Sequence, residues 1–131
     1  MLTITSAVIR GIIAEALRAR PQEACGYLAG TADMVTTWVP MRNTDASAEH
    51  FSMDPSEQFA AVRKLRAEGL KVLGVYHSHP ATPARPSAED IRLAYDPDIS
   101  YVIVSLDGGV TTTKSFRIRA GRSEEEPITV V

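Results

Sequence analysis

Two histidines and an aspartate are spaced in this sequence in a way that is typical of a metal site. His77 and His79 end an apolar run, residues 71–79, that is typical of a buried strand. Residues two apart in a strand point to the same face, so both imidazoles face the same way where this strand ends. Asp90 lies in the first turn of a helix that we expect to begin at Ser87. Two imidazole nitrogens and a carboxylate, with a fourth position left to water, are the usual ligands of a catalytic zinc ion.

The spacing leaves a second interpretation of Asp90 open. Ser87 and Asp90 also have the spacing of a capping box, in which the acid only satisfies backbone N–H groups at the start of the helix. The acid lies at the positive end of the helix in either role. Spacing alone therefore does not decide whether Asp90 binds a metal ion or caps the helix.

Glu23 and Cys25 lie near the start of an earlier strand, expected over residues 22–30. Taken by itself, Glu23 is most simply a solvated loop acid. Cys25 is most simply a small buried residue, because the sequence implies no partner for a Cys–His catalytic pair. The local pattern gives neither residue a catalytic role.

Length, composition and charge are those of an ordinary globular chain. The 131 residues are 44% hydrophobic and 23% charged, which fits one domain with a buried core. A net charge of -2, with acids and bases interspersed, argues against binding to nucleic acid or to an anionic membrane. No apolar run approaches the roughly 18 residues of a membrane span, and no signal peptide is recognised. The single cysteine suits a reducing compartment, so we expect a cytoplasmic protein.

The order of the expected helices and strands predicts one α/β (α+β) unit, with a mixed β-sheet flanked by about three helices. These elements must position the candidate site residues. Periodicity and capping residues predict two long helices, with N-caps at Thr5 or Ser6 and at Asp54, where Glu57 would close a capping box. The helices are expected over residues 4–20, 54–69 and 87–96, and further strands over residues 34–41, 51–53, 100–106 and 110–119.

The tail, residues 121–131, contains a run of three acids. The run at 124–126 is most simply a solvated turn, and the residues after it could pair as an edge strand. We expect the whole chain, 1–131, to form a single domain, and an edge strand in the tail could support a homodimer.

Taken together, these residues resemble the JAMM signature of the MPN-domain metalloproteases (the Mov34/PAD-1-like family), in particular its small prokaryotic members. His77 opens the signature His-x-His-Pro, which is followed by six residues, Ser87, two residues and Asp90. Glu23 stands where the family has a glutamate just before a Cys-Gly-containing strand. Asn43, Phe51 and the Asp54-Pro55 pair are also similar to the small prokaryotic members. The resemblance covers about residues 2–119.

The resemblance implies a fold similar to that of the cytidine deaminases, with one zinc ion per chain held by His77, His79 and Asp90. Water would occupy the fourth position. Glu23 would be the general base that takes the proton of this water and passes it to the leaving amine. Ser87 would hydrogen-bond the oxyanion of the tetrahedral intermediate.

Members of this family cleave peptide or isopeptide bonds after the C-terminal Gly-Gly of ubiquitin or ubiquitin-like proteins. The resemblance therefore implies a ubiquitin-like or sulfur-carrier protein as the partner, either trimmed at its C-terminus or freed of an attached amino acid such as cysteine. One alternative is a non-catalytic MPN scaffold, since some MPN domains are inert interaction modules. A deaminase-like reaction is a weaker alternative, because those enzymes use a Cys-x-x-Cys ligand pair and this chain has one cysteine.

Overall fold

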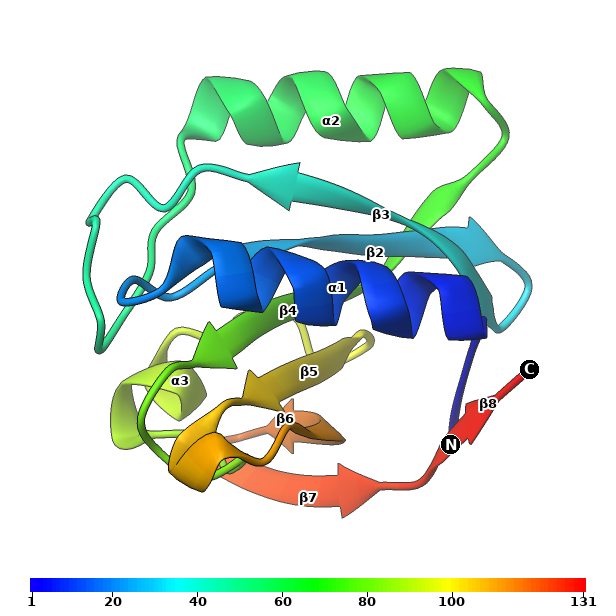
Figure 1. The fold of residues 1–131 in the computed structure, drawn as a ribbon. Coiled ribbons are helices and arrows are strands. Elements are labelled where there is room, and N and C mark those ends of the chain that lie inside the picture. Colours follow the sequence, from blue (N-terminus) through cyan, green and yellow to red (C-terminus); the bar gives the residue numbers. More distant parts are fainter.

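The computed structural model describes all residues, 1–131, as an eight-stranded sheet with three helices (Figure 1). A single 3₁₀ turn, η1, joins two of the strands. In chain order the elements are β1 (Leu2–Ile4), α1 (Ser6–Ala19), β2 (Cys25–Thr31), β3 (Met34–Met41), α2 (Pro55–Ala67), β4 (Lys71–His79), α3 (Ala88–Arg92), β5 (Ser100–Ser105), η1 (Asp107–Gly109), β6 (Thr112–Arg119), β7 (Arg122–Glu126) and β8 (Ile128–Val130).

The sheet is mixed, and its centre carries the two histidines. The strand order is β7-β6-β5-β4-β2-β3-β1-β8, so β4 lies between β2 and β5. β4 is antiparallel to β2 and parallel to β5. The register places Cys25 opposite His77 and His79 opposite Ser105. Because neighbours on both sides fix β4, the histidines are held on a rigid support.

The two faces of the sheet have different coverings. α1 covers one face (Figure 1), and its buried Val8 and Ile12 belong to the same apolar core as Tyr76 of β4. The opposite face carries a second apolar cluster that includes Ile103 and contacts Ile91 of α3. Side chains alternate along a strand, so Tyr76 packs under α1 while the histidines on either side of Ser78 face α3.

Helix starts agree with the sequence prediction. Thr5 accepts a hydrogen bond from Val8 N, and Asp54 accepts one from Glu57 N, so both act as N-caps. Glu57 does not close the predicted capping box. Its carboxylate instead pairs with Arg42 Nη2 at 3.2 Å, because Arg42 comes from the segment that leads into α2 and offers a charged partner.

Two predicted elements are wrong. Residues 51–53 form no strand, because this stretch is held by side-chain and loop contacts instead of a ladder. The acidic run at 124–126 is not a solvated turn but part of β7, which pairs with β6. Glu126 is buried at its end and accepts hydrogen bonds from Ser100 Oγ at 2.6 Å and Ser115 Oγ at 2.8 Å. These two hydroxyl partners compensate for the burial of the carboxylate.

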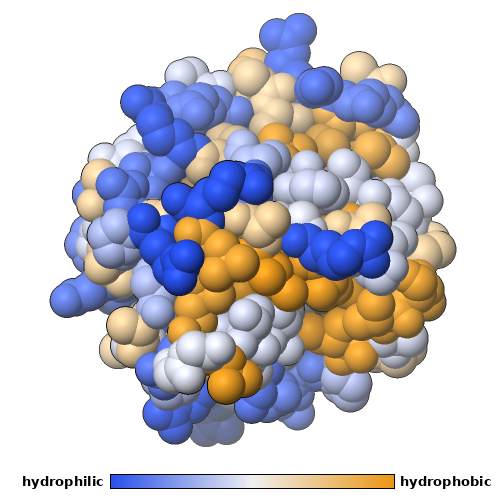
Figure 2. Space-filling model, in the orientation of Figure 1, coloured by the Kyte–Doolittle hydropathy of each residue, from blue (hydrophilic) through white to orange (hydrophobic).

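The ends of the chain meet at one edge of the sheet. β1, which was not expected from the sequence, pairs in parallel with both β3 and β8, and β8 is an edge strand as predicted. Figure 2 shows hydrophobic surface gathered across the α1 side and toward β8. Exposed apolar residues near this edge include Met34, Val130 and Val131. Homodimer formation through this edge stays a prediction. None of the three helices has the length and apolar composition that a transmembrane helix requires.

Candidate active site

The side chains of His77, His79 and Asp90 converge at the end of β4. The two Nε2 atoms lie 3.1 Å apart, and each lies 3.1 Å from Asp90 Oδ2. The histidines are buried, and the Asp90 side chain is 9% exposed. Three ligand-type atoms thus form a nearly equilateral triangle that is mostly shielded from water.

Each histidine of this triad is oriented by a contact away from the triangle. His79 Nδ1 lies 2.8 Å from the carbonyl oxygen of Pro83, which leaves the lone pair of Nε2 facing the other two atoms. The loop that carries Pro83 is tied to the sheet by Ser105 Oγ, which donates to the carbonyl of Thr82. His77 stacks against the ring of Phe51 with a centroid separation of 4.8 Å.

The triad fits a tetrahedral zinc ion. Zinc binds imidazole nitrogen and carboxylate oxygen at about 2.0–2.2 Å, so tetrahedral ligand atoms stand roughly 3.3–3.5 Å apart. The observed distances of 3.1 Å between the three atoms are slightly shorter than this separation. The atoms would therefore need to move apart only slightly to bind zinc. The triad offers two imidazole nitrogens and one carboxylate oxygen, which are ligands that zinc commonly binds. Three protein ligands leave the fourth position of a tetrahedral site open.

The electrostatics of the triad favour a cation. Burial raises the pKa of Asp90, but the imidazoles of His77 and His79 against its Oδ2 atom outweigh burial and hold the pKa far below its usual range. Burial alone would lower the pKa of His79, yet its bonds with Asp90 and Pro83 raise it overall. An ionised carboxylate between two imidazoles therefore attracts either a proton or a metal ion, which compete for the same atoms.

Glu23 is buried, only 3% exposed, and its carboxyl group interacts electrostatically with His79 and Asp90, so the interpretation as a solvated loop acid is wrong. Burial raises the pKa of its carboxyl group from 4.5 to about 8, with His79 lowering it and Asp90 raising it further. Its Oε1 is buried without a hydrogen-bond partner. A buried, unpartnered carboxyl with a pKa near neutrality is suited to accept and return protons.

Ser87 and Ser78 occupy different sides of the site. Ser87 is exposed at the N-cap of α3, where its Oγ accepts from Asp90 N and keeps its own hydrogen free to donate. Ser78 Oγ accepts from Ala24 N at 2.7 Å, which ties β4 to the residue after Glu23. Ser78 thus braces the strand from the face opposite the histidines.

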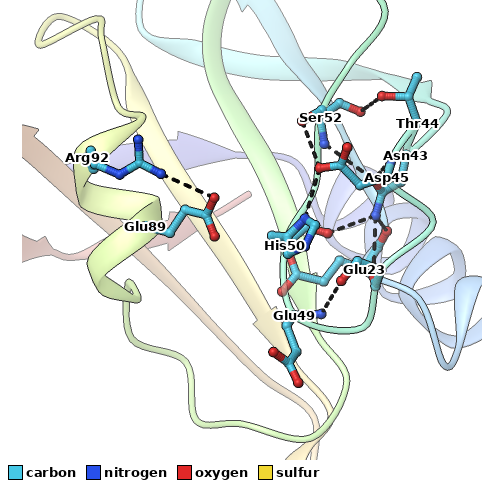
Figure 3. A network of polar contacts seen from close by, with 10 residues as sticks. Glu23, Asn43, Thr44, Asp45, Glu49, His50, Ser52, Glu89 and Arg92 are labelled. Carbon is cyan, nitrogen blue, oxygen red and sulfur yellow. Dashed lines mark hydrogen bonds and ion pairs between the residues drawn. The ribbon is translucent and has the colours of Figure 1, made fainter.

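The structure brings His77, His79 and Asp90 together, buries Glu23 within electrostatic reach of His79 and Asp90, and places Ser87 exposed at the N-cap of α3. Cys25 is buried and unpaired, as predicted. The sequence did not reveal the contact of Pro83 with His79, which uses a backbone carbonyl and so leaves no side-chain signature. His50 Nδ1 lies 2.9 Å from Asp45 Oδ2, within a network of polar contacts in the segment before α2 (Figure 3).

An apolar groove of about 540 Å³ opens beside the triad. His77 and Asp90 line one part of it. The rest is lined by α2, the segment before α2, the stretch after α3, and strands β2, β4, β5 and β6. Its apolar lining includes Phe51, Met53 and Tyr95. A chain lying in this groove would therefore pass the ligand atoms.

The chain belongs to the prokaryotic homologues of the JAB domain, because the model of that family matches residues 5–119. Its mixed sheet, three helices and structural neighbours confirm the predicted JAMM/MPN fold.

Curated relatives and a solved structure extend this comparison. The "CysO-cysteine peptidase" of Mycobacterium tuberculosis is 37% identical over 134 residues, covering 100% of this chain and 92% of the relative. The "Desampylase" of Haloferax volcanii is 37% identical over 94 residues, covering 70% of this chain and 68% of the relative. A solution structure of a protein from Desulfitobacterium hafniense is 48% identical, with a TM-score of 0.91 over 100% of this chain and 93% of that chain.

Proposed function

We propose that this protein is a JAMM-type zinc metallopeptidase that hydrolyses the amide bond after the C-terminal Gly-Gly of a ubiquitin-like or sulfur-carrier protein. The observation that carries the proposal is the triangle of His77, His79 and Asp90 ligand atoms, together with the buried carboxyl group of Glu23, which interacts electrostatically with His79 and Asp90. A bare metal site needs no such base, whereas hydrolysis of an amide requires one to activate water and protonate the leaving amine.

His77 Nε2, His79 Nε2 and Asp90 Oδ2 would hold about one zinc ion per chain. A zinc ion there would act as a Lewis acid and lower the pKa of water to about 7. Glu23 would accept the proton of the attacking water and deliver it to the leaving nitrogen. Ser87 Oγ would donate its free hydrogen to the developing oxyanion, while the backbone of α3 holds the hydroxyl in place.

The substrate class is supported by the groove and by the relatives. The apolar groove lined by His77 and Asp90 suits an extended peptide segment, which we take to be the C-terminal tail of the carrier. One relative is named a CysO-cysteine peptidase and another a desampylase, so conjugates of small carrier proteins are the class that these names favour. Release of an attached amino acid such as cysteine, or trimming of a precursor, are the two reactions we propose for this site.

Metal content tests the proposal first. Purified wild-type protein is measured beside a His77→Ala/His79→Ala double variant, after zinc is supplied to both. We expect about one zinc per wild-type chain and none in the variant. Asp90→Asn serves as a second variant of nearly the same shape, and circular dichroism checks that each variant is folded. Absence of specific zinc from the wild type would overturn the enzyme and favour a non-catalytic scaffold.

A further inference from the structure

The segment between β3 and α2, residues 42–54, has no regular secondary structure but is ordered around one amide side chain. Asn43 Nδ2 donates to the carbonyl oxygens of Glu23 and His50, each at 3.1 Å. Asn43 Oδ1 accepts from Asp45 N at 3.0 Å and from Ser52 N at 3.3 Å. The two ends of the amide therefore have different partners. Its oxygen binds two N–H groups within the segment, and its nitrogen joins the segment to Glu23 (Figure 3).

Glu23 depends on this segment because it precedes β2 and lies outside the ladder. Its backbone N–H donates to the carbonyl of Ser47 at 2.8 Å, and its carbonyl accepts from Asn43 Nδ2. Both main-chain polar groups of Glu23 are thus bound by the same segment. Its side-chain Oε1 has no hydrogen-bond partner, so hydrogen bonding to Oε1 does not fix the direction of the carboxylate.

The C-terminal part of the same segment also contacts the triad. Phe51 stacks on the ring of His77, with the ring planes inclined by 29°. Asn43 binds the carbonyl of His50, the residue immediately before Phe51. One amide therefore connects the backbone that carries Glu23 to the backbone that carries the aromatic support of a triad histidine.

We propose that Asn43 is a positioning residue for hydrolysis, whose Nδ2 donor fixes the main chain of Glu23 and thereby the place of its buried carboxyl group. The inference rests on the proposed function and adds a residue that touches neither metal nor substrate. A displacement of about 1 Å in a reacting group can cost on the order of 100-fold in rate, so loss of this donor has a measurable effect.

Asn43→Asp isolates the donor half, because it keeps an acceptor oxygen and removes the N–H groups. We expect kcat to fall by about 10- to 100-fold while KM stays within about threefold and the zinc content is unchanged. Asn43→Ala removes the donor without adding charge and should lose kcat to a similar extent. The loss should persist across the pH profile, whereas an effect of the added charge on the pKa of Glu23 would be recovered at higher pH.

Thr44→Val is the matched control. It removes a hydrogen bond of the same segment, from Thr44 Oγ1 to the carbonyl of Ser52 at 3.1 Å, but this bond does not involve Glu23. Its kcat should stay within about twofold of wild type. Wild-type kcat in both Asn43 variants, or an equal loss in Thr44→Val, would overturn the positioning role. A wild-type protein that binds no zinc or hydrolyses nothing would instead refute the proposed function.

Discussion

Ser87 and Asp90 hold each other reciprocally at the start of α3. Ser87 Oγ accepts a hydrogen bond from Asp90 N at 3.0 Å, and Asp90 Oδ2 accepts one from Ser87 N at 2.9 Å. The same Oδ2 atom lies 3.1 Å from both triad nitrogens. The two interpretations of Asp90 left open by the sequence are therefore compatible, because one oxygen caps the helix and completes the triangle.

This arrangement gives Ser87 two separable roles. Ser87→Ala should lower kcat by about 10²- to 10³-fold, the usual effect of removing an oxyanion donor, and should also weaken the cap by about 1 kcal/mol. Ser87→Thr keeps a hydroxyl that can cap and donate, so it should retain most of the activity. Steady-state kinetics and thermal unfolding of both variants check this. A Ser87→Ala enzyme with kcat close to wild type would remove Ser87 from the mechanism.

Burial of Glu23 should make the metal-free protein less stable as pH rises. Its folded-state pKa of about 8 exceeds its ordinary value of 4.5, so the folded chain binds more protons than the unfolded chain between these values. The free energy of unfolding should therefore fall between about pH 4.5 and pH 8, by on the order of 3–5 kcal/mol from this group.

Denaturant unfolding of metal-free Glu23→Gln beside wild type measures this contribution. The variant should be the more stable protein at pH 8, and the difference should disappear near pH 4, where both side chains are uncharged. Glu49→Gln changes an exposed glutamate of the neighbouring segment and should not alter the pH dependence. If the free energy of unfolding changed with pH in the same way in wild type and in Glu23→Gln, the pKa of Glu23 would not be raised in the folded protein.

Glu126 should stabilise the protein even though it lies in a run of acids. Glu126→Ala leaves the hydroxyls of Ser100 and Ser115 without their shared partner, which should cost about 1–3 kcal/mol in urea unfolding. Glu125→Ala removes an exposed neighbour whose contact with Lys114 is 3.8 Å, and should cost less than about 0.5 kcal/mol. Equal losses in the two variants would contradict a special role for the buried carboxylate.

The Glu126 cluster also predicts an acid-sensitive component of stability. Burial raises the pKa of Glu126, but hydrogen bonds from Ser100 and Ser115 lower it overall. A group with a lowered folded-state pKa stabilises the fold above its unfolded value and loses that contribution as pH falls through the folded value. Glu126→Gln should therefore flatten the decline in stability below about pH 4.5.

The sequence was most informative about features that depend on residues close together in the chain, such as the alternation of apolar side chains and the spacing of capping residues. The alternation around His77 and His79 and the caps at Thr5, Asp54 and Ser87 predicted elements that the structure contains. Local sequence patterns could not predict which polar side chains are buried by segments far away in the chain. Glu126 looks solvated among its neighbours because its partners, Ser100 and Ser115, lie on strands that only the fold brings together.

The same reasoning explains which parts of the site were visible. The position of Glu23 before a Cys-Gly strand suggested a role only through the family resemblance, since a lone acid before a strand is ordinarily solvated. Its main-chain N–H and carbonyl are bound by residues 42–54, a segment that the local pattern around Glu23 does not include. The Pro83 carbonyl is a backbone group, which side-chain patterns do not encode. Asn43 is a side chain, but the backbone carbonyls that it binds are brought to it only by the fold.

Hydrolysis of a defined carrier tests the central claim most directly. A small ubiquitin-like carrier protein extended by one cysteine after Gly-Gly is incubated with zinc-loaded wild type and with Glu23→Gln, and intact mass is followed over time. We predict that wild type removes the added residue and stops at Gly-Gly, while Glu23→Gln retains about one zinc per chain and is slower by several orders of magnitude. Cleavage by Glu23→Gln at the wild-type rate would contradict the proposed mechanism.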